Sequence, residues 1–571
     1  MILPNLIPVA TQRRFEPVAR IVAIVAAVLL AASAYLPWSW GEDALDDLTY
    51  LFGPSFIQFV ALGLGLLIAA LLVCSIKFPQ GIKGVRIGWI RGARAGATGL
   101  LIALLLIDVV IAVELGGLIN VVYGGWLATA LAVVVFGATR FLLTEDEPTL
   151  ATAKTPAWLS IVAIAVLMLV LLLTAYYALD QSDPGTFAVF GVYVGAAVIM
   201  LLRSGAMGWL SAASAAHRKV LVLSAFIVAF AFPFTQGSSE ANMSVATQVL
   251  IFAATAMGLN IVVGLAGLLD LGYIAFLGAG AFVAAMLSES AFATIGWNPP
   301  FIVVMLISGC VSAVLGLIIG SPTLRVSGDY LAIITLAFGE IFRLAMINLD
   351  GTDGPDLTHG SNGIPGVPPL NILGFDFGER HTILGVSIGT YSNYYFLLLI
   401  LLAVVILIFV RLNNSRIGRG WVAIREDEKA AEAMGVNTFG LKIFAFASGA
   451  FLAGMTGSIK AHHDISVTPD QYIFLESAFL LAAVVLGGMG TVLGVLIGAT
   501  LLRVMPEKLR FVNEYRLLMF GLLMVIMMRF RPEGIIASER RQLEFHQSDE
   551  DLAERIGEEH LDEEQVKEAG R

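Results

Sequence analysis

Long apolar runs, separated by short polar segments, recur along the chain from about residue 20 to residue 531. An α-helix rises ~1.5 Å per residue, so about 20 apolar residues cross a ~30 Å hydrocarbon core. No run alternates as a membrane β-strand does, and a backbone in lipid must satisfy its own hydrogen bonds, so helices are predicted. The predicted fold class is therefore all-α, a polytopic membrane helical bundle of about 14–16 segments, some of them short or broken. The predicted spans are 20–38, 56–76, 97–119, 121–143, 157–179, 186–202, 219–235, 243–263, 269–288, 299–320, 328–347, 391–411, 440–460, 475–503 and 515–530.

Glycines interrupt the apolar pattern at two places. The run 475–503 is long for one crossing and contains three closely spaced glycines, so we predict two short helices that form a hairpin or a broken pair. The stretch 264–272 is a second interruption, and the two places either correspond in an internal duplication or arose separately. Interrupted helices in a membrane usually border a cavity or a close helix contact. The residues predicted to line the translocation path are Asn260, Asp270, Gly487, Gly488 and Gly490.

Basic residues gather in every second loop. They precede the first span and are frequent in 77–96 and 411–425, whereas 41–47 and 350–390 hold few. Because Lys and Arg favour the cytoplasmic side, both termini are predicted to be cytoplasmic and the long loop 350–390 to lie outside. This orientation requires the run 475–503 to cross as two helices rather than one.

Composition and charge agree with a lipid environment. Of the 571 residues, 58% are hydrophobic and only 14% are charged, which excludes a soluble protein, and the net charge of −10 argues against nucleic-acid binding. Residues 538–571 carry 12 acidic and 5 basic residues, so most of the excess acidity belongs to this tail. No Gly-Lys dipeptide occurs, and therefore no phosphate-binding loop that would allow ATP hydrolysis by this chain.

Several ionisable residues interrupt the apolar runs. A charge in mid-membrane costs at least ~2.5–3.5 kcal/mol, so each such residue is a candidate for function. Local pairing is the competing interpretation, most clearly for Glu340, which precedes Arg343 by three residues on one helix face. The neighbours His462 and His463 are expected in an outer loop, where adjacent side chains rarely face one metal ion. The remaining candidates are Asp108, Glu114, Asp270 and Glu476.

The stretch 416–437 is the most informative polar segment. Its Ala- and Glu-rich part, 423–434, predicts one short helix that Gly435 terminates. Ile424, Ala431 and Met434 would share a narrow apolar face, with charged residues around it. Such a helix suits the groove of a partner protein, although an ordinary solvated connector has the same pattern.

This segment resembles the E-A-A…G coupling loop of ABC-importer permeases, in the form found in LivM-type permeases of branched-chain amino-acid importers. Four further blocks resemble the same family in the same order. The resemblance covers about residues 220–535 and leaves 1–218 and the acidic tail outside. The predicted domains are an accessory transmembrane region (1–218), a LivM-like permease core of the type II kind (219–535) and a cytoplasmic tail (536–571). The four blocks are 258–282, 324–336, 362–368 and 484–491.

The resemblance implies a permease subunit that translocates hydrophobic, branched-chain amino acids by alternating access in a bacterial plasma (inner) membrane. It implies a LivH-type permease, two ABC ATPase subunits and an extracytoplasmic binding protein as partners, with ATP and Mg²⁺ on the ATPases and no cofactor in this chain. The outer loop 350–390 either receives the binding protein or forms a rigid cap. The ATPase-coupling residues would be Arg416, Gly418, Arg419, Arg425, Glu426, Asp427, Ala430, Ala431 and Gly435.

Three other hypotheses remain open at the level of sequence. The first keeps the importer and changes its cargo to urea, short amides or other amino acids. The second is an ion-coupled secondary transporter that would use Asp108, Glu114 or Asp270 as coupling sites. The third is an accessory membrane scaffold without transport.

Overall fold

The computed structural model describes residues 8–40, 45, 55–78, 87–144, 156–181, 183–237, 239–323, 329–352, 354–383, 386–509, 516–530 and 533–536. The expectations for the acidic tail and for residues 324–328 fall outside this part of the chain. Among the described residues, 12 helices are long and apolar enough to cross a membrane, and one further apolar helix, Ile274–Met286, is shorter. The prediction of a polytopic helical bundle is confirmed.

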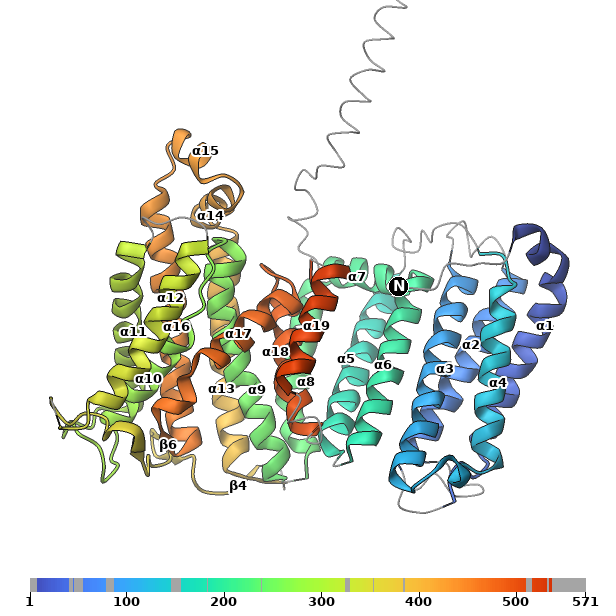
Figure 1. Cartoon of the computed structure of the whole chain (residues 1–571), viewed down its shortest axis with the longest axis horizontal. Coiled ribbons are helices and arrows are strands. Elements are labelled where there is room, and N and C mark those ends of the chain that lie inside the picture. Colours follow the sequence, from blue (N-terminus) through green and yellow to red (C-terminus); the bar gives the residue numbers. More distant parts are fainter. Residues whose placement is uncertain are drawn as a thin grey trace, which may run out of the picture. The chain divides into compact units, whose positions relative to one another are not determined.

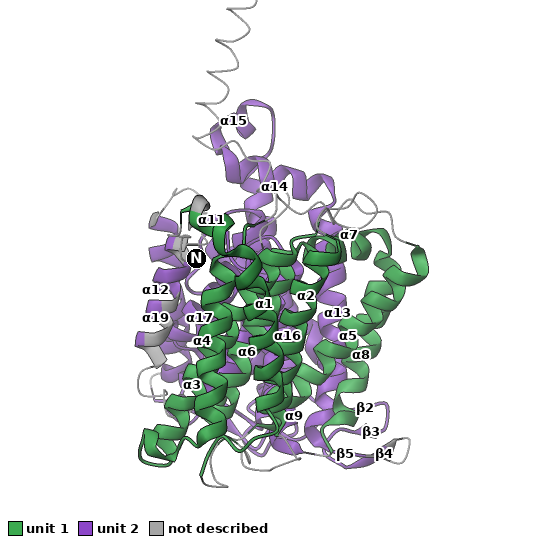
Figure 2. Cartoon of the chain, turned by 90° about the vertical axis from the view of Figure 1, so that its right-hand side faces the viewer, with its two compact units in different colours: residues 1–237, 507–513 green, residues 238–506, 514–571 purple. Residues whose placement is uncertain are grey.

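Contacts divide the chain into two compact units (Figure 2). The first comprises residues 1–237 and 507–513, and the second comprises 238–506 and 514–571. The helix Arg218–Thr235 therefore belongs to the first unit. The predicted domain borders at 218 and 535 stay predictions. The first unit contains α1 (Val9–Ser33), α2 (Phe56–Lys77), α3 (Trp89–Glu114), η1 (Leu118–Asn120), α4 (Tyr123–Arg140), α5 (Ala157–Asp180), α6 (Pro184–Ser204), α7 (Ala206–Ala216) and α8 (Arg218–Thr235).

The core of the first unit lies among α1, α2, α3, α4 and α6, where small and aliphatic side chains pack together. The start of α6 shows how local sequence sets a helix end: Asp183 caps it by accepting a hydrogen bond from the Thr186 amide at 2.5 Å, and Pro184 occupies the first turn. Asp108 on α3 is buried and accepts a hydrogen bond from the Thr129 hydroxyl on α4 at 2.8 Å. In the first unit this carboxyl thus joins two helices.

The second unit is built around the long helix α16. Its helices are α9 (Glu240–Asn260), the π-helical turn η3 (Ile261–Leu265), α10 (Ile274–Met286), α11 (Phe301–Thr323), α12 (Asp329–Asn348), η4 (Gly360–Asn362), α13 (Thr390–Asn413), α14 (Arg416–Glu426), α15 (Glu428–Ala433), α16 (Thr438–Asp464), η5 (Pro469–Tyr472), α17 (Phe474–Gly487), α18 (Val492–Lys508) and α19 (Arg516–Phe530). Helix α16 packs against α9, α10 and α11. Gly280 of α10 lies against the Gly454 backbone of α16, where a Cβ would overlap it. Small residues let helices approach closely in lipid, and here they set the crossing of α10 and α16.

The run 475–503 forms two helices, as predicted. Helix α17 ends at Gly487, α18 begins at Val492, and a non-helical turn joins them. The chain segment after α19 closes this turn, because the amides of Ile535 and Ile536 donate to the carbonyls of Leu486 and Gly487 at 2.8 and 3.0 Å. This turn is one of the two glycine breaks expected from sequence.

The second unit has two different ends (Figure 1). At one end α14 and α15 project beyond the long helices. At the other end, short antiparallel pairs order much of the stretch 350–390: β2 (Asn371–Ile372) with β3 (Phe375–Asp376), and β4 (His381–Ile383) with β5 (Val386–Ile388). A third pair, β1 (Ile364–Pro365) with β6 (Ser466–Val467), ties this stretch to the end of α16.

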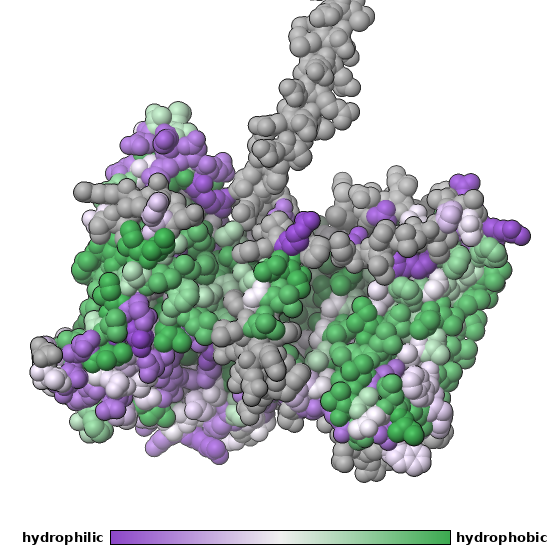
Figure 3. Space-filling view, viewed as in Figure 1, coloured by the Kyte–Doolittle hydropathy of each residue, from purple (hydrophilic) through white to green (hydrophobic). Residues whose placement is uncertain are grey.

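Apolar side chains cover the middle of the helices in each unit, between more hydrophilic surfaces at the ends (Figure 3). Exposed large hydrophobic residues are frequent along the spans, for example Val109 on α3, Leu306 on α11 and Leu407 on α13. Water would not solvate such a surface, whereas lipid chains would, which agrees with the spans predicted from the hydrophobic pattern.

Candidate functional site

The projecting segment contains two helices rather than the single one predicted over 423–434. Ser415 caps α14 by accepting a hydrogen bond from the Gly418 amide at 3.2 Å. Asp427 has an extended backbone and caps α15, because its carboxylate accepts from the Ala430 amide at 3.0 Å. The charged residue that seemed to lie inside one helix is therefore the N-cap that starts a second one.

One face of this pair is anchored to the membrane helices. Trp421 of α14 is fully buried, and its indole N–H donates to the Leu441 carbonyl of α16 at 2.7 Å. Lys442, also on α16, forms an ion pair with Glu428 of α15. Ile424 and Ala431 are buried, as expected for an apolar face. Met434 is 85% exposed, so its predicted place on that face was wrong. Helix α15 ends at Ala433, so Met434 lies beyond the helix that was predicted to hold it.

Most of the predicted coupling residues lie on the outer face of α14, α15 and the turn that follows. Gly418 and Ala431 are buried against the bundle, and Arg425 is half-buried. The remaining side chains are available to a partner. The exposed residues are Arg416, Arg419, Glu426, Asp427, Ala430 and Gly435.

Arg425 connects α14 to the first glycine break. Its Nη1 donates to the Gly264 carbonyl at 3.0 Å, across 161 residues of sequence. Gly267 lies against the same arginine side chain with a φ of +73°, and a Cβ at this position would overlap the arginine stem. Glycine suits this position because it adopts the left-handed backbone without strain and leaves room for the Arg425 side chain. The backbone of the break at Gly267 therefore packs directly against α14.

Asn260 connects the first break to the second. It is fully buried at the end of α9, its Oδ1 accepts from the Gly490 amide at 2.8 Å, and its Nδ2 donates to the Thr491 carbonyl at 3.2 Å. The π-helical turn η3 follows immediately, and such turns are frequent at functional sites. Asn260 and Gly490, two of the predicted path residues, are thus in direct contact. Gly487 ends α17, and Gly488 begins the turn that contains Gly490.

Asp270 belongs to the first break, and its hydrogen bond among the described residues is local. It lies in the non-helical segment between α9–η3 and α10, 1% exposed. Its Oδ1 accepts from the Gly272 amide at 2.9 Å, while Oδ2 has no hydrogen-bond partner among the described residues.

Two other carboxylates singled out from sequence, Glu340 and Asp108, have partners in the protein. Arg343 of α12 forms ion pairs with Glu340 at 2.9 Å, as the spacing predicted, and with Asp470 at 3.0 Å. Asp108 is bonded to Thr129 in the first unit. Glu114 is the last residue of α3. These contacts favour structural roles for Glu340 and Asp108.

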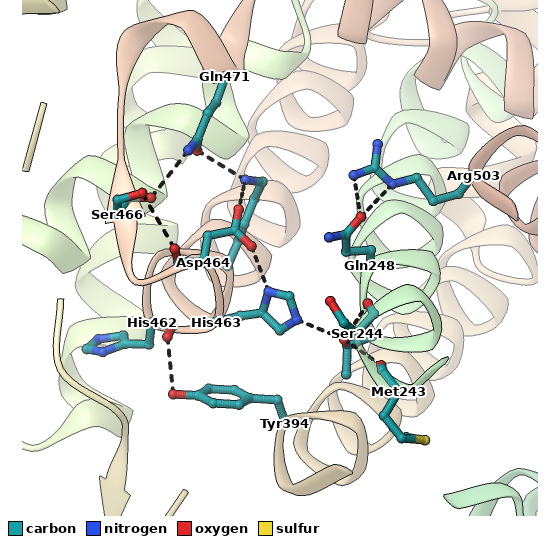
Figure 4. A network of polar contacts seen from close by, with 12 residues as sticks. Met243, Ser244, Gln248, Tyr394, His462, His463, Asp464, Ser466, Gln471 and Arg503 are labelled. Atoms are coloured by element: carbon teal, nitrogen blue, oxygen red, sulfur yellow. Dashed lines mark hydrogen bonds and ion pairs between the residues drawn. The ribbon is translucent and has the colours of Figure 1, made fainter. Parts of the chain in front are cut away.

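His462 and His463 are not in a loop, as expected, but in the last turn of α16, where both are buried. Their rings point to different sides (Figure 4). His462 Nδ1 contacts the Pro368 carbonyl at 2.7 Å, whereas His463 Nδ1 contacts Asp464 at 2.6 Å and Nε2 contacts the Thr247 hydroxyl at 2.8 Å. No group of three possible metal ligands exists among the described side chains.

His463 is part of a polar cluster that the sequence did not predict. Asp464 accepts from His463 and from Lys460, and Lys460 also donates to Gln471 at 3.2 Å. Nearby, Arg503 of α18 donates to Gln248 of α9 from Nε at 3.1 Å and from Nη2 at 2.6 Å (Figure 4). In the sequence these residues are only isolated polar positions at the ends of separate apolar runs. Packing of the helices brings them together into one cluster.

A family model described as "Branched-chain amino acid transport system / permease component" matches residues 242–528, the stretch from α9 to α19 that contains both breaks and the α14–α15 pair. The chain belongs to this family. The match begins after α8, so the helices of the first unit up to α8 lie outside it. As a member of this permease family, the chain is a multi-pass membrane component of an ABC transporter and not its catalytic subunit. The family and fold predicted from the ordered motifs are confirmed.

Curated relatives agree with this assignment. The LivM permease protein of the high-affinity branched-chain amino acid transport system of Salmonella typhimurium is 39% identical over 344 residues, covering 58% of this chain and 77% of that protein. A probable LivM of Methanocaldococcus jannaschii is 24% identical over 253 residues, 41% of this chain and 68% of the relative. The Salmonella typhimurium LivH permease protein is 31% identical over 132 residues, 23% of this chain and 42% of its own length. No solved structure matches the chain.

Proposed function

We propose that this permease carries branched-chain amino acids across the plasma membrane in an ATP-driven importer. Its partners would be a LivH-type permease, two ABC ATPase subunits and an extracytoplasmic binding protein, with ATP and Mg²⁺ held by the ATPases. The observation that carries the proposal is the chain of contacts from α14 through Arg425 to the first glycine break and through Asn260 to the second. A pair of helices attached in this way can transmit movement to broken membrane helices.

The geometry supports α14 and α15 as the ATPase-coupling element. Their inner face is fixed by Trp421 and by the Lys442–Glu428 ion pair, while their outer face exposes charged residues and Met434. An ATPase bound to the outer face would displace the pair as a unit. Because Arg425 Nη1 donates to the Gly264 carbonyl, the first break would move with α14. Asn260 would transmit this movement to the turn between α17 and α18. Alternating access would then open and close at the two breaks.

The opposite end of the second unit is proposed to face the outside and to receive the binding protein. Its short strand pairs form an ordered surface, and the pair of β1 with β6 connects that surface to α16. Helix α16 also carries Lys442 at the other end, so one rigid helix spans from the receiving surface to the coupling helices. In this orientation both termini and α14–α15 are cytoplasmic, as the distribution of Lys and Arg predicts.

The experiment is uptake of labelled leucine into proteoliposomes that contain the chain with its co-encoded partners. Uptake is expected only with ATP inside and binding protein outside, and it is expected to stop when the phosphate-binding lysine of the ATPase is replaced. Uptake by the chain alone, driven by a proton gradient, would refute the importer. Uptake of urea or a short amide in place of leucine would retain the importer and change its cargo.

A further inference from the structure

A small cavity lies within the second unit, separate from the two breaks. Its volume is about 240 Å³, slightly below the ~300–1,000 Å³ of pockets for drug-sized ligands, so it suits a smaller molecule. Buried aliphatic side chains from three helices form much of its wall: Ile251 of α9, Ile274 and Leu277 of α10, and Leu480 of α17. The rest of the lining comes from Phe252, Thr255, Glu476, the polar cluster around Asp464 and the Arg503–Gln248 pair. The Asp464 cluster and the Arg503–Gln248 pair are drawn in Figure 4.

Two of the charges at this cavity neutralise each other. Asp464 accepts hydrogen bonds from Lys460 and His463, and Lys460 is held further by Gln471. Both partners of this ion pair are mostly buried, with side chains 18% and 22% exposed. Asp464 and Lys460 therefore fix the shape of the wall and leave no net charge for a ligand to balance.

The other two charges are not balanced by the protein. Arg503 gives Nε and Nη2 to the neutral amide of Gln248, and no described carboxylate lies within ion-pair distance of it. The Glu476 side chain, in the first turn of α17, has no hydrogen bond or ion pair among the described residues. Charges left unpaired in a membrane bundle are costly and usually mark a functional path. One cation and one anion thus face a cavity with an aliphatic wall.

We infer that this cavity is a substrate site of the permease for a zwitterionic α-amino acid with an aliphatic side chain. The Arg503 guanidinium binds the α-carboxylate, Glu476 binds the α-ammonium group, and Ile251, Ile274, Leu277 and Leu480 contact the side chain. The inference rests on the proposed function. It adds the location at which this chain recognises the transported amino acid. A ligand that carries only one of the two charges would leave the other charge unpaired, which gives the site its selectivity.

The test measures equilibrium binding of labelled L-leucine to the assembled membrane complex in nanodiscs, without binding protein. R503Q and E476Q are each expected to weaken binding tenfold or more, the usual effect of losing a hydrogen bond to a charged group. R203Q removes an exposed arginine at the end of α6, far from the cavity in sequence, and is expected to bind leucine as the unchanged protein does. Size-exclusion profiles verify assembly. R503K keeps the charge without the planar fork and replaces R503Q if that variant fails to assemble.

Two leucine analogues separate the roles of the charges. 3-Methylbutylamine lacks the carboxylate, and 4-methylpentanoate lacks the ammonium group. Both are expected to compete poorly in the unchanged protein. In R503Q the preference for leucine over 3-methylbutylamine should shrink, and in E476Q the preference over 4-methylpentanoate should shrink.

Binding of leucine by R503Q and E476Q as in the unchanged protein would overturn the site, even if ATP-driven uptake occurs. An unchanged complex that transports leucine but does not bind it at equilibrium would overturn it as well. If the complex does not transport leucine at all, the proposed function fails first, so the two failures are distinguishable.

Discussion

Asn260 is a single side chain that joins two parts of the permease separated by more than two hundred residues. Both of its polar ends are used, since Oδ1 accepts from Gly490 and Nδ2 donates to the Thr491 carbonyl. The Asn260 side chain is fully buried, and its two partners, Gly490 and Thr491, are half-buried. The site depends on the amide group itself, because an amide offers an acceptor and a donor on two separate atoms of one short side chain.

Replacing Asn260 by Ala is expected to cost about 1–3 kcal/mol of stability, since two hydrogen bonds worth about 0.5–1.5 kcal/mol each, to the Gly490 amide and the Thr491 carbonyl, are lost. Leucine uptake by the assembled importer should fall more than stability alone explains, because the two breaks are no longer joined. Thermal unfolding in detergent and uptake at equal protein amounts measure the two effects. N348A removes an asparagine that bonds only its own helix, at Leu344, and serves as control. Full uptake by N260A would exclude a coupling role for this side chain.

At the scale of elements, the functional property of α14 and α15 is their two-sidedness. Buried Trp421 and the Lys442–Glu428 pair hold the inner face, so the outer face can bind a partner without unfolding the attachment. Met434, directly after α15, is 85% exposed at the end that is proposed to bind the ATPase. Methionine is enriched in the cores of protein–protein interfaces, so Met434 is a candidate contact for the ATPase.

Replacing Met434 by Glu is therefore expected to weaken association with the ATPase roughly tenfold or more and to leave the permease folded. Its stability should change by less than about 0.5 kcal/mol, as for other exposed positions. Pull-down of the ATPase on the tagged permease measures association. L373E places the same charge on an equally exposed residue of the β2–β3 turn, 98% exposed, and should not change the pull-down. Equal recovery of ATPase by M434E and the unchanged protein would remove Met434 from the interface.

At the scale of the whole molecule, the second unit presents two unlike ends, and the proposed transport direction depends on which end is outside. The strand pairs and the α14–α15 pair lie at opposite ends of α16 (Figure 1). Leu373 and Met434 are strongly exposed at these two ends and therefore report on them. The arrangement makes orientation a property that one labelling experiment can measure.

In a background with Cys74 and Cys310 changed to Ser, L373C and M434C each place a single thiol at one end. A membrane-impermeant maleimide added to intact cells is expected to label L373C and to label M434C only after the membrane is opened. The physical reason is the charge rule that keeps the basic loop around Arg416 in the cytoplasm. Labelling of M434C in intact cells, with L373C protected, would reverse the orientation and with it the direction of transport.

The sequence by itself determined the lipid environment, the helical class, the permease family and the positions of both glycine breaks. These follow from local pattern: apolar length, glycine spacing and ordered motifs are readable one segment at a time. The prediction of one helix over 423–434 was wrong, because Asp427 lies within an Ala- and Glu-rich stretch typical of a helix interior but caps a second helix. The sequence also placed His462 and His463 in a loop, because polar residues at the end of an apolar run do not show how far the helix continues.

Only the tertiary structure decided which distant residues meet. Three observations join helices that are far apart in sequence. Asn260 bonds Gly490, and Arg425 bonds the Gly264 carbonyl. Arg503 and Glu476 line one cavity. No single segment carries that information, because each polar residue alone looks like an isolated interruption of an apolar helix. Helix packing brings these interruptions together, since polar groups in lipid must find one another or a ligand.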